Sequence, residues 1–242
     1  MKSNIKLGMP HLTYNGLDPV WLAKHLGDCH WNILSKGPAL NANNERLYAS
    51  FFCWSLDFNQ GQDHYTEGDQ LEINSQLFKF NNQVYRSMHT LSNGENFSTG
   101  IFDSIFVKKD MDNQKLVRDD PSYNVNDISK IDTVFLEEHK KIKVQLRQET
   151  EFNSYKELQF NPESMFNAVK ILYFANYLNL VFQSEWLHYP ELKGPIKTIK
   201  TYYFANIEPD DCVSGLTTII GNTSTTKLIS GNKALSLCVI TR

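Results

Sequence analysis

Apolar and polar residues alternate most clearly in residues 46–51, "RLYASF". Here an apolar residue at every second position alternates with Arg46, Tyr48 and Ser50. Successive side chains of a β-strand point to opposite faces, so the pattern predicts a strand whose apolar side faces a core. Tyr48 then lies on the opposite side, between a cation and a hydroxyl. Aromatic residues are also common in strands for structural reasons alone.

Two segments have the pattern of helices. Asp18 is a favourable N-cap, Pro19 suits the first helical position and Gly27 suits a C-terminal stop, which predicts a short first helix. Residues 162–186 are apolar at helical spacing and on nearly every side, as is typical of a helix buried in a core. Polar residues such as Lys170 interrupt this segment, so it is not predicted to span a membrane.

The order helix, strand, acidic turn and further strands occurs twice. "EGDQLEI" in the first half and "PDDCVSGL" in the second stand about 141 positions apart. Strands are also predicted on both sides of "NNQ" at 81–83, over about 99–110, before and after "EPDD" at 208–211, and at the C-terminal end. A long helix wrapped by an antiparallel sheet is an α+β architecture.

The repeat divides the chain into two structural units. We expect a first unit over residues 1–110, a connector over 111–160 and a second unit over 161–242. The first part of the connector has the polar composition of an exposed linker. Residues 133–148, "TVFLEEHKKIKVQLRQ", are compatible with either a helix or a strand.

Composition narrows the class of protein. The chain has 242 residues, 41% of them hydrophobic, and a net charge of −3, which gives no electrostatic reason to expect nucleic acid or an anionic membrane as partner. The four cysteines form no CxxC pair, so we expect buried thiols and no zinc site. No signal peptide is visible at the N-terminus, and we expect a cytoplasmic protein.

Longer motifs carry a resemblance to a known family. "MPHLTYNGLDPVWLAKHLGDCHW" followed by "RLYASFF" resembles the double hot-dog family of polyketide biosynthesis, whose best-known type is the leinamycin-type acyltransferase/decarboxylase. The second half, with "LYFANYLNLVF", "TYYFANIEPDD" and "ALSLCVITR", is similar to hot-dog domains, which commonly act on acyl thioesters. The resemblance covers most of the chain and weakens over residues 108–160.

The resemblance implies a specific reaction. Such an enzyme takes methylmalonyl-CoA, forms an acyl-tyrosine, loses CO2 and delivers a propionyl group to the thiol of an acyl carrier protein. The matching tyrosine is Tyr48. The expected partners are an acyl-CoA and a carrier protein, and no metal or organic cofactor is expected because the thioester itself stabilises the developing charge. The two units of the chain would then imitate the homodimer of single-unit relatives. Whether two such chains form a further homodimer is left open by the sequence.

The chemistry needs support around Tyr48. A tyrosine with a pKa near 10 is only about one part in a thousand ionised at neutral pH, so it needs a nearby cation or base to act as a nucleophile. Arg46 is the candidate cation and His30 the candidate base, although His30 could equally be a structural histidine. Asp28 could orient the ring of His30, or simply form a turn after Gly27.

Decarboxylation also needs hydrogen-bond donors at the thioester oxygen, where negative charge develops. Ser50 and Asn206 occupy equivalent-looking strand positions and are the candidate substrate-binding donors. Ordinary structural hydrogen bonding is the alternative for both side chains.

A thioesterase is a competing hypothesis. Hot-dog thioesterases often place an acidic residue at or just before the central helix, where this chain has Asn167 and Ala168. Glu163 and Glu185 lie at the two ends of that segment and keep the hypothesis open.

Two further hypotheses stay open. A hot-dog dehydratase pairs a histidine with an acid, and the candidate histidines are His30 and His89. A non-catalytic protein that binds acyl carrier proteins would use a basic strip such as Lys193, Lys197 and Lys200. The same lysines also suit an ordinary strand edge, where they oppose aggregation.

Overall fold

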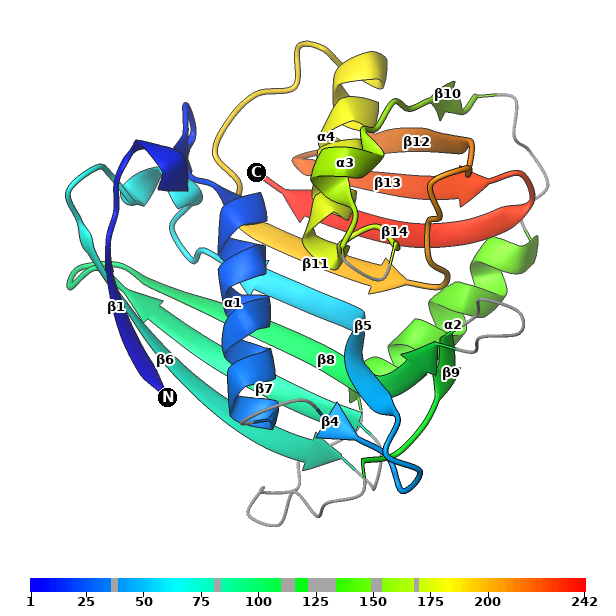
Figure 1. Cartoon of the computed structure of the whole chain (residues 1–242). Helices are drawn as coiled ribbons and strands as arrows, with labels where there is room; N and C mark the ends of the chain where they lie inside the picture. The colour runs from blue at the N-terminus through cyan, green and yellow to red at the C-terminus, as the bar shows by residue number, and fades with distance from the viewer. Residues whose placement is uncertain (36–38, 81–83, 110–115, 122–133, 149–153, 168–169) are drawn as a thin grey trace.

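The structure is a computed structural model, and it describes residues 1–35, 39–80, 84–109, 116–121, 134–148, 154–167 and 170–242 (Figure 1). The "NNQ" segment, Ala168 and much of the expected connector lie outside these residues. A twelve-stranded sheet runs through the whole molecule, and helices α1 (Pro19–Leu34) and α4 (Tyr177–His188) both lie over the same face of it (Figure 1).

The first half of the chain builds one side of the sheet. Its elements are β1 (Lys2–Lys6), η1 (Met9–His11), β2 (Leu12–Thr13), β3 (Gly16–Leu17), α1 (Pro19–Leu34), β4 (Ala39–Leu40), β5 (Arg46–Asp57), η2 (Gln62–His64), β6 (Gln70–Phe80), β7 (Val84–Ser92), β8 (Phe97–Lys109) and β9 (Leu116–Arg118). The expected strands around Tyr48, on either side of "NNQ" and near 99–110 are present. Part of the expected linker forms β9, which pairs with the end of β8.

The second half builds the other side. Its elements are α2 (Val134–Gln148), β10 (Lys156–Glu157), α3 (Pro162–Met165), η3 (Phe174–Asn176), α4 (Tyr177–His188), β11 (Thr198–Tyr203), β12 (Val213–Ile220), β13 (Thr223–Ser230) and β14 (Lys233–Thr241). The segment that the sequence left open between helix and strand is therefore helical, as α2.

The two halves have the same topology. The main path of the sheet runs β1-β6-β7-β8-β5-β11-β14-β13-β12-β10, so the order outward from the centre is the same on both sides. The halves join where β5 and β11 pair antiparallel, from Cys53 with Tyr202 to Asp57 with Thr198. The sheets of the two units are joined edge to edge, because β5 and β11 satisfy each other's backbone groups.

Helix α1 begins as predicted and ends later. The side chain of Asp18 accepts a hydrogen bond from the Val20 amide at 2.8 Å, and Pro19 opens the helix. The expected stop at Gly27 is wrong, since the helix continues to Leu34. Gly27 serves packing instead: a Cβ placed there would lie 2.6 Å from the Phe174 ring. The absence of a side chain at this position lets α1 approach the second unit.

The predicted helix over 162–186 is broken. It forms the single turn α3, an isolated bridge between Phe166 and Leu172, the short η3, and then α4. Lys170, at φ 61°, is in the left-handed region and cannot continue a helix. The apolar residues of this segment do face the core, since Leu172 and Ala175 are buried there. Part of the segment, however, is a packed loop and not a helix.

Helix α2 covers the opposite face of the central strands. Ile142 packs against a small cluster that contains Cys53 and Tyr202. Glu138 forms a 2.6 Å ion pair with Lys200 on β11. Helices α1 and α4 contribute to the main core on the other face.

The expectation of buried thiols holds for three of the four cysteines. Cys29, Cys53 and Cys238 are buried free thiols, and Cys212 is an exposed one.

Candidate functional site

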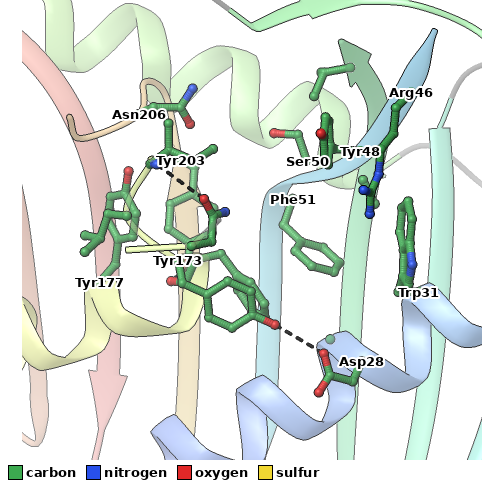
Figure 2. A pocket seen from close by; sticks show the side chains of 17 residues that line it. Asp28, Trp31, Arg46, Tyr48, Ser50, Phe51, Tyr173, Tyr177, Tyr203 and Asn206 are labelled. Atoms are coloured by element: carbon green, nitrogen blue, oxygen red, sulfur yellow. Dashed lines mark hydrogen bonds between the residues drawn. The ribbon is translucent and has the colours of Figure 1, made fainter. Parts of the chain in front are cut away.

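A pocket of about 300 Å³ lies where the two units meet; we call it the junction pocket (Figure 2). Both units contribute to its walls. It is lined by Gly27, Asp28, Trp31, Arg46, Tyr48, Ala49, Ser50, Phe51, Val107, Asn167, Ile171, Leu172, Tyr173, Phe174, Tyr177, Tyr203 and Asn206.

Strand β5 forms one wall of the junction pocket. The β5 residues that line the pocket lie between Arg46 and Phe51. The pairing of β5 with β11, which we call the seam between the units, begins only at Cys53, so β11 does not pair with this end of β5. The Arg46 guanidinium carbon lies 5.3 Å from the centroid of the Tyr48 ring. This contact follows from their i, i+2 spacing, which puts both side chains on one face of the strand. Figure 2 shows Ser50 beside Tyr48 on the same wall.

The second unit forms the opposite wall, and Tyr203 ties it to β5. The Tyr203 hydroxyl accepts a 2.6 Å hydrogen bond from the indole N–H of Trp54 and donates one of 2.7 Å to the Phe174 carbonyl. Burial raises the pKa of Tyr203 well above its ordinary value, so it stays a neutral donor. These bonds fix the segment before α4 against the central strands.

Helix α1 closes the pocket with a carboxyl group. Asp28 accepts a 3.4 Å hydrogen bond from the Tyr173 hydroxyl of the second unit (Figure 2). Burial raises the pKa of Asp28, and the nearby His25 and the Tyr173 bond oppose this shift. Burial and the Asp28 charge also raise the pKa of Tyr173. Because α1 continues past Gly27, Asp28 is a helical residue facing the pocket, and the interpretation as a turn former is wrong.

Four of the five residues predicted from the sequence as site residues line this one pocket. They are Arg46, Tyr48, Ser50 and Asn206. The first three come from β5 of the first unit. Asn206 lies after the end of β11 in the second unit, so the strand position expected for Asn206 is wrong. The fold still brings together residues far apart in the sequence. Their roles remain predictions.

The fifth residue, His30, is fully buried and is not among the lining residues. Its Nδ1 lies 2.7 Å from the Ser87 hydroxyl and its Nε2 lies 2.7 Å from the Ser104 hydroxyl. Burial, with a smaller contribution from His89, lowers the pKa of His30 to about 3. Such contacts are those of a structural histidine, the alternative that the sequence left open.

His89 belongs to the same network. Its Nε2 lies 2.7 Å from Ser87 Oγ and its Nδ1 lies 2.7 Å from Ser75 Oγ. The two histidines proposed for a dehydratase therefore bond to serines. Within the part of the chain that the structure describes, no acidic side chain is hydrogen-bonded to either ring.

The acidic residues considered for a thioesterase lie elsewhere. Glu163 is exposed in α3, and Glu185 is buried in an ion pair with Arg242. Asn167 does line the junction pocket, and its side-chain oxygen accepts a 3.3 Å bond from the Ile171 amide. Ala168 lies outside the described residues.

Asp28 and Tyr173 meet in the junction pocket, a contact that the sequence pattern does not indicate. Their contact joins α1 to a loop of the other unit, and the sequence pattern carries no signal for that approach. Gly27 was the available hint, since a glycine within a helical pattern can have a packing reason as well as mark a helix end.

No helix among the described ranges is long and apolar enough to cross a bilayer. No family model matches the chain, and no curated protein matches it in sequence.

Similar solved structures do exist. The 12:0-ACP thioesterase from Umbellularia californica is similar with a TM-score of 0.71 and 12% identity, over 100% of this chain and 96% of that one. An acyl-ACP thioesterase from Bacteroides thetaiotaomicron has a TM-score of 0.68 and 10% identity, over 100% and 96%. A MaoC-like dehydratase from Phytophthora capsici has a TM-score of 0.50 and 10% identity, over 80% and 71%. With one helix-wrapped antiparallel sheet repeated within it, the chain has the double hot-dog fold.

Proposed function

We propose that the chain binds an acyl thioester in the junction pocket and acts as an acyltransferase/decarboxylase on a methylmalonyl-type thioester, with Tyr48 as nucleophile. The observation that carries this proposal is the grouping of Arg46, Tyr48, Ser50 and Asn206 in one pocket. The family resemblance selects Tyr48. The proposal takes Arg46 as the cation and Ser50 and Asn206 as the donors, and all four residues line this pocket.

The first step is acyl transfer. The Tyr48 oxygen attacks the thioester carbonyl, the carbon–sulfur bond breaks, and CoA leaves as a thiol with the phenolic proton. Arg46 supplies the positive charge that stabilises the phenolate, since its guanidinium lies over the ring.

Decarboxylation follows on the acyl-tyrosine. The bond to the carboxylate carbon breaks, CO2 leaves, and the electron pair forms an enolate on the former thioester carbonyl. Ser50 and Asn206 donate hydrogen bonds to this oxygen as charge develops. Protonation at the α-carbon gives a propionyl ester of Tyr48.

The last step regenerates the tyrosine. The carrier thiol attacks the propionyl carbonyl, the bond to the Tyr48 oxygen breaks, and the thiol proton passes to that oxygen. Asp28 is the carboxyl that the pocket offers for moving protons, because burial brings its pKa closer to neutrality. His30 is placed too deep in the core for this role.

Thioester hydrolysis is the second candidate. Two of the similar structures are named acyl-ACP thioesterases. The pocket also holds a carboxyl, Asp28, whose raised pKa suits a base that activates water. In this alternative Asp28 takes the place of the acid that the sequence lacks before the central helix of the second unit.

The test is intact-protein mass spectrometry after mixing the chain with methylmalonyl-CoA. The proposal expects an adduct with the mass of a propionyl group, which is absent in Tyr48→Phe and retained in Tyr14→Phe. Tyr14 is a suitable control because it is 86% exposed and is not a residue of the junction pocket.

The other outcomes are equally specific. Free methylmalonic acid without an adduct, lost in Asp28→Asn, identifies a hydrolase. An unchanged methylmalonyl-CoA over the whole time course refutes both activities on this substrate.

A further inference from the structure

Two phenylalanine rings meet between the walls of the junction pocket. Phe51 comes from β5 of the first unit and Phe174 from η3 of the second, and both line the pocket. Their ring centroids lie 4.5 Å apart, with the ring planes tilted by 52°. The two rings are therefore in contact although they belong to different units. We call them the phenylalanine pair.

Behind the phenylalanine pair lies filled core. The Phe102 ring contacts both members, at centroid distances of 5.6 Å from Phe51 and 6.0 Å from Phe174. Trp54 stacks on Phe102, and the His30 ring lies 4.9 Å from Phe51. Phe102, Trp54 and His30 are at most 1% exposed, and none of them lines the pocket. The pocket therefore ends at the phenylalanine pair on the side of the core.

The position of Phe174 is fixed by its neighbours. The Tyr203 hydroxyl donates a 2.7 Å hydrogen bond to the Phe174 carbonyl, which holds the backbone. Gly27 of α1 lies so close that a Cβ placed there would be 2.6 Å from the Phe174 ring. The ring thus packs against α1 as well as against Phe51, and moving it would disrupt both contacts.

The volume of the pocket limits what can bind in front of the phenylalanine pair. A water molecule takes about 30 Å³ of the liquid and a methylene group is of similar size, so the pocket of about 300 Å³ has room for roughly ten non-hydrogen atoms. A methylmalonyl group with its sulfur fits within this number. The carbon chain of a dodecanoyl group alone exceeds it.

We propose that the phenylalanine pair restricts the acyl group of the substrate to a short one, of about the size of a methylmalonyl or propionyl group. The inference deepens the proposed function and rests on it for the choice of an acyl thioester as ligand. Phe51 and Phe174 determine specificity in this proposal and take no part in the chemistry at Tyr48. A rigid apolar pocket discriminates by at least about tenfold against a chain that is one methylene group too long.

Alkyl thioethers of coenzyme A test this inference, because they lack the thioester carbonyl and cannot acylate Tyr48. Isothermal titration calorimetry compares the propyl, hexyl and dodecyl thioethers with coenzyme A itself. We expect the propyl thioether to bind more tightly than coenzyme A. The hexyl and dodecyl thioethers should bind at least about tenfold more weakly than the propyl thioether.

Variants of the phenylalanine pair assign this preference. Phe174→Ala should strengthen binding of the hexyl thioether at least about tenfold, because it removes the ring that ends the pocket. Phe51→Leu keeps an apolar side chain, should shift the preference in the same direction, and serves as the second variant if Phe174→Ala does not fold. Phe97→Ala is the control and should keep the wild-type preference, because Phe97 is 61% exposed and does not line the junction pocket.

Two results would overturn the inference. The first is a wild-type protein that binds the dodecyl thioether as tightly as the propyl thioether. The second is a folded Phe174→Ala or Phe51→Leu protein that keeps the wild-type order of affinities.

The inference and the proposed function fail separately. A short-chain preference without a propionyl adduct on Tyr48 retains the inference and refutes the proposed acyl transfer. A propionyl adduct on Tyr48 together with equal binding of all three thioethers retains the proposed function and refutes the inference. If no thioether binds differently from coenzyme A and no adduct forms, both are refuted.

Discussion

The buried histidine network makes stability depend on pH in a calculable way. Burial lowers the pKa of both His30 and His89 to about 3, whereas an unfolded histidine titrates near 6.5. The unfolded chain therefore binds more protons than the folded chain between these values. The free energy of unfolding is therefore highest above pH 6.5, where both states hold neutral histidines, and it falls progressively as the pH falls toward 3.

The size of the effect follows from this difference. A shift of one pKa unit is worth 1.36 kcal/mol. As the pH falls from about 7 to about 5, protonation of each histidine in the unfolded chain therefore lowers the free energy of unfolding by about 2 kcal/mol. The pair together costs about 4 kcal/mol. This is a large part of the 5–15 kcal/mol that typically holds a domain folded.

Urea unfolding at about pH 7 and about pH 5 measures this difference in the free energy of unfolding. Replacing His30 by Gln, whose amide can bond both Ser87 and Ser104, removes one titrating group and should reduce the pH-dependent loss by about 2 kcal/mol. His64→Gln is the control, because it makes the same substitution at an exposed position. Equal wild-type stability at both pH values would refute the reasoning, as would a His30→Gln variant with the full wild-type pH dependence.

Three further predictions follow from the packing and the site. Gly27→Ala should lower the free energy of unfolding by about 1–3 kcal/mol, measured by urea unfolding, because the new Cβ meets the Phe174 ring. Arg242→Met should cost about 3–5 kcal/mol in the same assay, since it leaves the buried Glu185 carboxylate unpaired. Asp28→Asn should slow turnover and remove a limb of its pH–rate profile whose midpoint lies above the ordinary carboxyl pKa, measured by CoA release. An unchanged profile would exclude Asp28 from proton transfer.

Local signals in the sequence predicted much of the fold. The Asp18–Pro19 pair located the start of α1, and alternation located β5. Gly27 and the 162–186 segment misled for one reason: local patterns do not record which element approaches from the other half of the chain. Gly27 is a glycine because the Phe174 ring packs against it, and not because the helix ends there. Leu172 is apolar because it lies in the core, although it belongs to a loop and not to a helix.

The candidate site could also be predicted only in part. Arg46, Tyr48 and Ser50 share a strand and could be grouped from their spacing. The Asp28–Tyr173 contact could not, because it joins residues 145 positions apart.

The seam between β5 and β11 also sets the order in which the molecule assembles. It pairs Ser55 with Lys200, and contacts of such long sequence separation form slowly because a large loop must close first. Tyr48 and Asn206 lie on opposite sides of this seam. During refolding, helical circular dichroism should therefore return before the ability to bind a ligand. The binding pocket is a late product of folding, and each half of the chain alone carries just one of its walls.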